Sequence, residues 1–239
     1  MLGSERASKV QEAFMSLNVR NPTPLSVGGF KIKGITADTH FGHANIILYA
    51  ERPFVDKNTD LDYRGRWISR QVSERRAAEM DEALIASYNS VATDPDDVIL
   101  HLGDVFFGDP EKYLDRLNGK ILFVTGNHDK QMLNFLYRNK NQNKVKHLGN
   151  LTEVDLDGQM AVVCHFAMRV WNKSHYGAWH LYGHSHASLD EPDTMRSMDV
   201  GVDAAYKRLG EYRPFTIPEI SEIMNKKDFK PVDHHTGET

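Results

Sequence analysis

Cysteine is almost absent from this sequence, which has one, Cys164, among 239 residues. A single cysteine excludes an internal disulfide framework and every zinc module built on several thiolates. Long apolar runs are also missing, because stretches such as 121–124 are far shorter than the ~18 residues that would span a bilayer. The N-terminal segment lacks the apolar stretch typical of signal peptides. We therefore expect a cytoplasmic protein without a membrane partner.

Neither positive nor negative charge is in large excess. The chain has 29 Lys and Arg residues against 33 Asp and Glu residues, a formal net charge of −4. This balance, and the lack of a basic tract interleaved with aromatic residues, argue against a surface for long nucleic acids. An apolar content of 40% is enough for a buried core. The residue that does stand out is histidine, with twelve copies beside the single cysteine.

No repeat, low-complexity tract or linker rich in proline, glycine and serine divides the chain. We predict one domain at 31–227, an N-terminal extension at 1–30 and a polar C-terminal tail at 228–239. Within the extension, residues 4–18 have the pattern of a short amphipathic helix. Oligomeric state has no signal in the sequence.

Short apolar runs bounded by turn residues predict the strands of an α/β domain. The predicted strands are 31–37, 97–102, 120–125, 160–164 and 179–182. Strands alternate with helices in the first half, which predicts a mostly parallel sheet, and the second half is expected to add antiparallel hairpins. One hairpin is predicted at Asp157-Gly158, whose residue types favour a type I′ turn.

Within the domain, three helices are predicted from spacing and capping signals. Apolar residues at helical spacing from Trp67 to Tyr88 predict a long helix. Asp109-Pro110 predicts the start of a second helix, which Gly119 is expected to end. Thr216 and Glu219 have the spacing of a capping box ahead of a third.

Almost every predicted strand ends in a small group of Asp, Asn and His residues. The five segments are Asp38-Thr39-His40, Gly103-Asp104, Gly126-Asn127-His128-Asp129, His165 and Gly183-His184-Ser185-His186. Ligands of α/β sheets bind outside the carboxyl ends of the strands, where these segments would meet. Carboxylate, amide and imidazole donors together suit zinc, manganese or iron. One such segment arises easily by chance, but five after successive predicted strands favour a shared metal site.

The spacing within these segments suggests how the side chains are aimed. In an extended chain, a period of two turns both side chains of Asp38-Thr39-His40, and both histidines of His184-Ser185-His186, to one side. Glycines at 103, 126 and 183 would allow backbone turns that other residues resist. Asp104, which follows its strand on a tight turn, could bridge two ions.

In this order the segments resemble the calcineurin-like metallophosphoesterase family. The resemblance spans 38–186 and is tightest to compact bacterial and phage-type members, in the segments 38–43 (DTHFGH) and 179–184 (WHLYGH). The segments 199–203 (DVGVD) and 212–214 (YRP) are similar to the closing segment of these members. The resemblance implies an αββα sandwich, with two central mixed sheets flanked by helices and a dinuclear metal site at one edge.

Carried over residue by residue, the resemblance implies two divalent ions, with manganese expected first and nickel, zinc or iron as alternatives. One ion would be held by Asp38, His40, Asp104 and His186. The other would be held by Asp104, Asn127, His165 and His184. His128 would protonate the leaving oxygen, and Asp129 would orient His128. The predicted reaction is in-line attack on phosphorus by a hydroxide that bridges the two ions.

Residues around this core are predicted to contact the substrate, which would be a small phosphate ester. They are His43, Asn45, Arg52, Arg169, Trp171 and Asn172. Arginine can bind a phosphate with its planar fork, and Trp171 could stack on a base. The alternative for Arg169 and Trp171 is that they only pack a loop.

The function we predict is a phosphodiesterase acting on a small nucleotide or cyclic nucleotide. A phosphomonoesterase acting on a small phosphorylated metabolite is the main alternative, because the same metal ligands serve both reactions. A nuclease and a non-catalytic scaffold of the same fold are less favoured. His128, the residue expected to face the substrate, argues against the scaffold.

Overall fold

The computed structural model describes residues 32–231. The predicted extension 1–30, with its helix at 4–18, and residues 232–239 of the predicted tail lie outside the described residues. The elements in chain order are β1 (Ile32–Thr36), α2 (Ala44–Tyr49), α3 (Arg70–Val91), β2 (Val98–His101), α4 (Glu111–Leu114), β3 (Lys120–Phe123), α5 (Lys130–Arg138), β4 (Val145–His147), β5 (Leu151–Leu156), β6 (Gln159–Cys164), the 3₁₀ helix η1 (Ser174–Tyr176), β7 (Trp179–Tyr182), β8 (Ser197–Asp199), α6 (Val202–Leu209), β9 (Phe215–Thr216) and α7 (Ile217–Asn225).

The strands form two mixed sheets. The first has the order β4-β3-β2-β1-β9, in which β1 to β4 are parallel and β9 is antiparallel to β1. The second has the order β5-β6-β7-β8. The mostly parallel sheet predicted for the first half is confirmed.

The second sheet differs from its prediction in one respect. β5 and β6 form the expected hairpin, and Asp157 and Gly158 between them have φ values of 56° and 92°, as a type I′ turn requires. However, β6, β7 and β8 are parallel, so the expectation of further hairpins is wrong. Segments 165–178 and 183–196 connect them, and both are long enough to cross over the sheet and return in the same direction.

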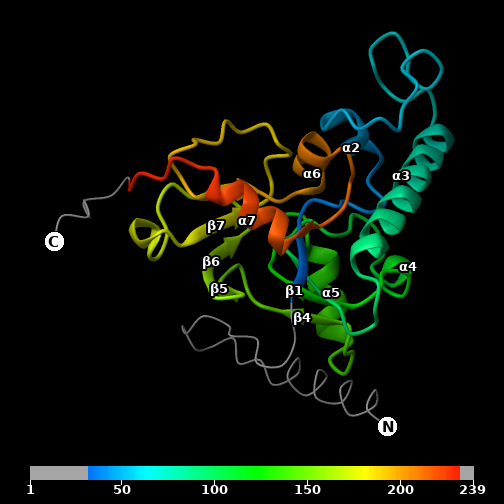
Figure 1. The fold of residues 1–239 in the computed structure, drawn as a ribbon. Coiled ribbons are helices and arrows are strands. Elements are labelled where there is room, and N and C mark those ends of the chain that lie inside the picture. The colour runs from blue at the N-terminus through cyan, green and yellow to red at the C-terminus, as the bar shows by residue number, and fades with distance from the viewer. Residues whose placement is uncertain (1–31, 232–239) are drawn as a thin grey trace.

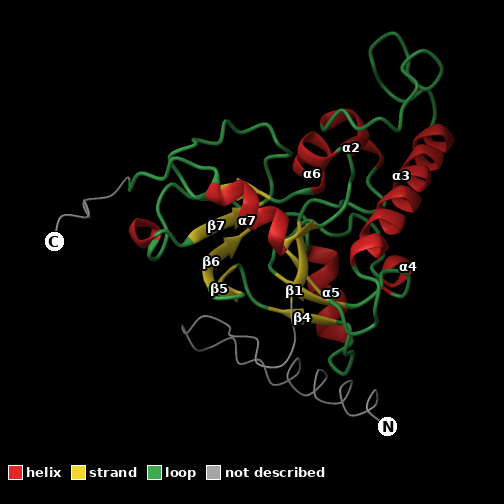
Figure 2. Cartoon of the chain, in the orientation of Figure 1, coloured by secondary structure: helices red, strands yellow, loops and turns green. Residues whose placement is uncertain are grey.

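The core lies in two layers on either side of the first sheet. On β2, Val98 and Leu100 face the second sheet, whereas Ile99 faces the helices, so every residue of this strand is buried. This explains its uninterrupted apolar run, which is typical of strands covered on both faces. Figure 2 shows α3, α4 and α5 on the side of the first sheet that faces away from the second. The chain therefore has the predicted α/β architecture of two mixed sheets flanked by helices.

The helix ends agree only in part with their predictions. Glu219 accepts the backbone N–H of Thr216 at 2.8 Å, which confirms the capping box of α7. The carboxylate of Asp109 accepts the backbone N–H of Glu111, but α4 ends at Leu114 instead of continuing to Gly119. Gly119 has a φ of 70° and serves the turn into β3.

Among residues 32–231, no helix is both long and apolar enough to cross a membrane.

Parallel pairing in both sheets decides where the polar segments meet. β1, β2 and β3 are parallel neighbours in the first sheet, and β6 and β7 are parallel neighbours in the second. Figure 1 labels β1 of the first sheet and β6 and β7 of the second. The carboxyl ends of parallel strands lie at the same edge of a sheet. The loops that follow β1, β2 and β3 therefore share one edge of the first sheet, and those that follow β6 and β7 share one edge of the second. The backbone N–H of His184, after β7, donates to the carboxylate of Asp38, after β1, which places the two edges together.

The layer between the sheets should dominate the stability of the fold. Leu100 is fully buried there, so Leu100→Ala is expected to lower the free energy of unfolding by about 3 kcal/mol through lost apolar contact and a residual cavity. Urea denaturation of the metal-free protein measures this loss. The matched control is Leu189→Ala, because Leu189 is 48% exposed and its truncation should change the free energy by less than about 0.5 kcal/mol. Equal losses in the two variants would contradict the assigned core.

Candidate metal centre

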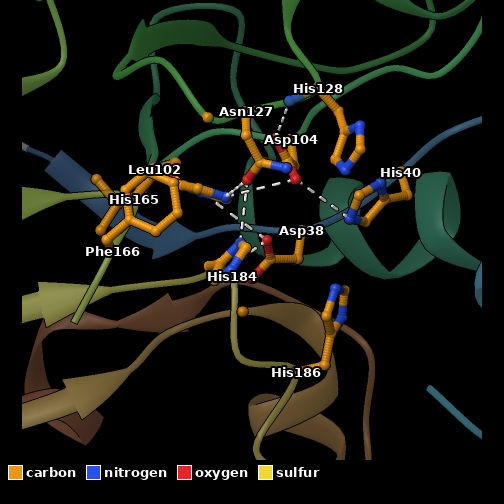
Figure 3. Close-up of polar contacts among 12 residues, drawn as sticks. Asp38, His40, Leu102, Asp104, Asn127, His128, His165, Phe166, His184 and His186 are labelled. Carbon is orange, nitrogen blue, oxygen red and sulfur yellow. Dashed lines mark hydrogen bonds and ion pairs between the residues drawn. The ribbon is translucent and has the colours of Figure 1, made fainter. Parts of the chain in front are cut away.

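The five polar segments predicted to meet do come together at this edge of the sheets. Figure 3 shows side chains from both sheets converging on one space, with Asp104 near its centre. Two groups of side chains are placed so that their ligand atoms lie within 4.8 Å of one another. One group is Asp38, His40 and His186, and the other is Asp104, His165 and His184.

Asn127 adds an amide oxygen to the second group. Its Oδ1 lies 3.0 Å from Nε2 of His165 and 3.0 Å from Nδ1 of His184. The other ring nitrogen of His165, Nδ1, lies 2.8 Å from the carbonyl oxygen of Leu102 and can donate a proton to it. That bond directs Nε2 of His165 toward the shared space, as hydrogen bonds around metal sites commonly do.

Asp104 lies between the two groups. Its Oδ2 is 3.6 Å from Nε2 of His40 in the first group and 3.4 Å from Nε2 of His165 in the second. Its Oδ1 accepts the backbone N–H of His128 at 2.8 Å, which fixes the rotation of the carboxylate. One oxygen of Asp104 is thus available to both groups.

Most of these residues have an unusual backbone conformation. The φ angle is positive at Asp38 (57°), His40 (51°), Asp104 (56°), His184 (67°) and His186 (46°). The left-handed region is uncommon for residues with a Cβ, and it persists where surrounding contacts impose it, often at functional sites. The side chains of Asp38 and His40 are therefore brought together by these turns, and not by the extended chain that the sequence suggested.

Glycines next to the ligands act mainly by permitting close approach. Gly103 has a φ of 96°, as predicted for a turn. Gly126 and Gly183 do not have a left-handed φ, and a side chain at either position is excluded by neighbouring atoms instead. A Cβ on Gly126 would lie 2.2 Å from Oδ1 of Asp104, and one on Gly183 would lie 2.7 Å from Oδ2 of Asp38. Only glycine lets these loops pass so close to the carboxylates.

The electrostatics of the site fit a bound cation. Both ring nitrogens of His40 are buried without a hydrogen-bond partner, and burial lowers the pKa of this residue to about 2. Burial also raises the pKa of Asp38. For His165, burial opposes protonation, but the carboxylates of Asp104 and Asp38 outweigh it and raise the pKa to about 9. Unpartnered imidazole nitrogens beside buried carboxylates are a donor set that suits a divalent ion of the zinc or manganese type.

Asp129 does not have the predicted position behind His128. Its buried carboxylate accepts three backbone N–H groups, from Asp104 at 2.7 Å, Val105 at 2.9 Å and Gly126 at 2.6 Å. These bonds join the loop after β2 to the loop after β3. The predicted orientation of His128 by Asp129 is therefore corrected to an organising role for the Asp104 loop, since the carboxylate is occupied by backbone groups.

Arg52 is not available to a substrate. Its side chain is fully buried, and its guanidinium donates to the carboxylate of Asp203 and to the backbone oxygens of Asp38 and Thr39. Asp203 in turn contacts Nδ1 of His186 at 2.7 Å. The predicted phosphate contact of Arg52 is wrong because all of its polar directions are used inside the protein. Sequence alone assigned no role to Asp203, although it lies in the closing segment that carried part of the resemblance.

Trp171 and Asn172 lie away from the ligands. The ring of Trp171 is buried against Val162 and Ala178 on the outer face of the second sheet, and its Nε1 donates to the oxygen of Ala178. Base stacking by Trp171 is therefore wrong, and the alternative that it packs the loop holds. The amide nitrogen of Asn172 donates to Glu153 on β5, which ties this residue to the sheet.

The three remaining residues predicted to contact the substrate, His43, Asn45 and Arg169, differ in burial and in their contacts. His43 is half-buried beside His40, with ring centroids 5.6 Å apart. Asn45 is exposed, but its Oδ1 accepts the indole N–H of Trp67. Arg169 is exposed on the loop that follows His165, and its contact with a phosphate stays a prediction.

Two exposed aromatic rings lie next to the predicted metal ligands, although the sequence predicted no role for them. Phe107 is 41% exposed, stacks on His43 with ring centroids 3.8 Å apart and lies 5.7 Å from the ring of His128. Phe166 is 49% exposed and lies 4.6 Å from the ring of His184. In the sequence, each of these phenylalanines is marked only by its position close to a predicted metal ligand. That position does not tell an exposed ring from a ring in the core.

Most of the residues in this site lie in a part of the chain that is similar to known proteins. A sequence model described as the calcineurin-like phosphoesterase superfamily domain matches residues 76–202. That range includes the predicted ligands from Asp104 to His186 and begins after Asp38 and His40, which the fold itself adds to the site. The Uncharacterized protein MJ1445 of Methanocaldococcus jannaschii is 26% identical over 198 residues, which cover 80% of this chain and 90% of that protein.

One solved structure shows the same fold. The protein of unknown function AQ665 from Aquifex aeolicus is 18% identical and has a TM-score of 0.52, with 80% of this chain and 97% of that chain covered. A structure described as a novel archaeal phosphodiesterase is also 18% identical and covers 74% of this chain and 87% of its own. Its TM-score is 0.37.

Metal affinity should increase with pH. The raised pKa values of Asp38 and His165 mean that both side chains hold protons in the metal-free protein under mildly acidic conditions, and a cation must displace these protons. Raising the pH removes them, so affinity for Mn²⁺ should increase between pH 6 and pH 8 by about tenfold per pH unit for each proton displaced. Calorimetric titration in two buffers of different ionisation enthalpy counts the released protons. A pH-independent affinity without proton release would contradict the prediction.

Proposed function

The chain belongs to the calcineurin-like phosphoesterase superfamily, and from this premise we propose that it is a phosphodiesterase that hydrolyses a small nucleotide or cyclic nucleotide with two divalent ions. The observation that carries the proposal is the position of Asp104, whose Oδ2 is within 3.6 Å of one ligand group and 3.4 Å of the other. A single carboxylate oxygen between two sets of donors is the arrangement expected of a bridging ligand.

The two ions would have different ligands apart from Asp104. Asp38, His40 and His186 would hold one of them together with Asp104, and the other would be held by Asp104, Asn127, His165 and His184. When bound, such ions activate a water as the nucleophile and neutralise charge on the phosphoryl oxygens. The mixed oxygen and imidazole donors support manganese as the first candidate, with nickel, zinc and iron as alternatives.

His128 is the proposed proton donor to the leaving oxygen. Its backbone N–H is fixed by Asp104, and its exposed ring lies 5.8 Å from the ring of His40, on the open side of the site. No hydrogen bond within the described residues occupies its ring nitrogens, and Figure 3 draws no contact to them, so they are free to meet a substrate. A group in this position can reach an ester oxygen without displacing a metal ligand.

The aromatic rings support an ester that carries a flat group. Phe107 and His43 form a stacked pair beside His128, and burial lowers the pKa of His43 to about 4, which keeps its ring neutral at physiological pH. Phe166 offers a second exposed ring beside His184. Aromatic side chains bind nucleobases by stacking, at about 1–3 kcal/mol per base. A phosphate monoester of an aliphatic metabolite would use neither ring.

Turnover on a panel of esters tests the reaction class. With Mn²⁺ supplied, we expect the protein to hydrolyse cyclic and linear nucleotide diesters at least tenfold faster than the corresponding monoesters. His128→Ala should keep both ions and lose about 10²–10⁴-fold in turnover, because only proton donation is removed. Metal content of the same samples is the control. Full turnover by His128→Ala would exclude its assigned role, and a preference for monoesters would favour the phosphomonoesterase.

The role of the Phe107 ring in substrate binding can be separated from the chemistry. Phe107→Leu should raise KM for a nucleotide diester by about tenfold, because stacking is lost, and should leave KM for dimethyl phosphate unchanged. Tyr176→Leu is the matched control, since Tyr176 is 81% exposed on η1, away from the ligand groups. If both variants behave like the unmodified protein on both esters, the ring has no part in substrate binding.

A further inference from the structure

Arg52 is a buried cation with an unusual set of partners. It lies just after α2, and its guanidinium binds both oxygens of Asp203, with Nε to Oδ1 and Nη2 to Oδ2 each at 2.8 Å. Nη2 also donates to the backbone oxygen of Asp38 at 2.7 Å, and Nη1 donates to that of Thr39 at 3.2 Å. A bidentate arginine–carboxylate pair has a fixed geometry, so these contacts define the relative positions of segments that are distant in the sequence.

Asp203 connects this cation to a predicted metal ligand. It lies in the first turn of α6, and its Oδ2, already bound to Arg52, is 2.7 Å from Nδ1 of His186. A carboxylate at this distance accepts the Nδ1 proton, which leaves Nε2 of His186 as the nitrogen that can bind a cation. Asp203 therefore selects the tautomer of His186, and Arg52 holds Asp203 in place.

The same cation also acts on the other two members of this ligand group. The backbone oxygens of Asp38 and Thr39 that it binds lie between two residues with left-handed φ angles, Asp38 and His40. Within residues 32–231, no hydrogen bond or ion pair of Arg52 or Asp203 reaches the second group of Asp104, His165 and His184. The direct contacts of Arg52 and Asp203 are thus confined to one half of the site, and the link to the other half runs through Asp38, whose carboxylate accepts the backbone N–H of His184.

We propose that Arg52 and Asp203 are positioning residues for one metal position alone, the one formed by Asp38, His40 and His186. The inference rests on the proposed function only in assuming that both positions bind an ion. It follows that the affinities of the two positions can be separated by mutation. Loss of the pair should empty the first position at metal concentrations where the second stays occupied.

Metal titration of the full chain tests this proposal without measuring catalysis. The metal-stripped protein is titrated with Mn²⁺ by calorimetry, and electron paramagnetic resonance distinguishes a coupled pair of ions from a single ion. The unmodified protein should bind two ions with a coupled spectrum. Asp203→Asn should weaken one site by about 10–100-fold, change the other by less than about threefold and give the spectrum of a single ion.

Two further variants separate positioning from a purely structural role. Arg52→Lys keeps the charge but cannot bind both oxygens of Asp203, so it should weaken the same site; it also carries the test if Asp203→Asn does not fold. Asp60→Asn is the matched control, because Asp60 is a buried carboxylate paired with Arg75 and Arg76 away from the ligands. It should leave both affinities unchanged.

The outcomes distinguish the inference from the proposed function. Equal weakening of both sites in Asp203→Asn and Arg52→Lys, or no weakening of either, would overturn the inference. Binding of a single ion by the unmodified protein would overturn it as well. If the unmodified protein binds two ions and the variants lose one of them, the inference stands, even if no phosphate ester is hydrolysed and the proposed function fails.

Discussion

The buried carboxylates of Asp38 and Asp104 share a small space with several imidazoles, and the surrounding structure depends on how that charge is balanced. Isolated buried charges are costly, so they need protons, cations or hydrogen bonds. Without a cation, the balance is reached by protonation: the pKa of Asp38 is raised by burial, and that of His165 is raised to about 9 by its carboxylate neighbours despite burial. Neither ring nitrogen of His40 has a hydrogen-bond partner, and this residue is the clearest sign that a cation completes the site.

The crowding of carboxylates and imidazoles at this site is accompanied by strain in the backbone. Five residues of the two ligand groups have left-handed φ angles, a conformation that costs on the order of 1–3 kcal/mol per residue. Three features stabilise this backbone conformation. They are the backbone N–H groups bound by Asp129, the backbone oxygens bound by Arg52, and the close approach of loops at glycines such as Gly183. These contacts place donors from two sheets in a common geometry.

Buried arginine and aspartate side chains in this fold hold the ligand loops in place and do not contact the substrate. Arg52 and Asp129 belong to residue types that often contact substrate, and the sequence placed both near the reacting centre. In the structure their polar atoms are taken up by backbone groups and by Asp203. Burial separates the two roles: an arginine with 1% exposure cannot reach a ligand in solvent, whereas the exposed Phe107 and Phe166 can.

The sequence by itself determined the parts of this protein that depend on local pattern. Apolar runs and turn residues located the main strands, and the order of Asp, Asn and His segments after them indicated one shared metal site, because carboxyl ends of neighbouring parallel strands must meet. Only the tertiary structure decided which polar residues face that site and which face inward. Asp203 follows the last predicted ligand by 17 residues, yet it contacts His186 and Arg52, and no local pattern encodes such contacts between distant segments. Their physical basis is burial, which exists only once the two sheets and α6 have packed together.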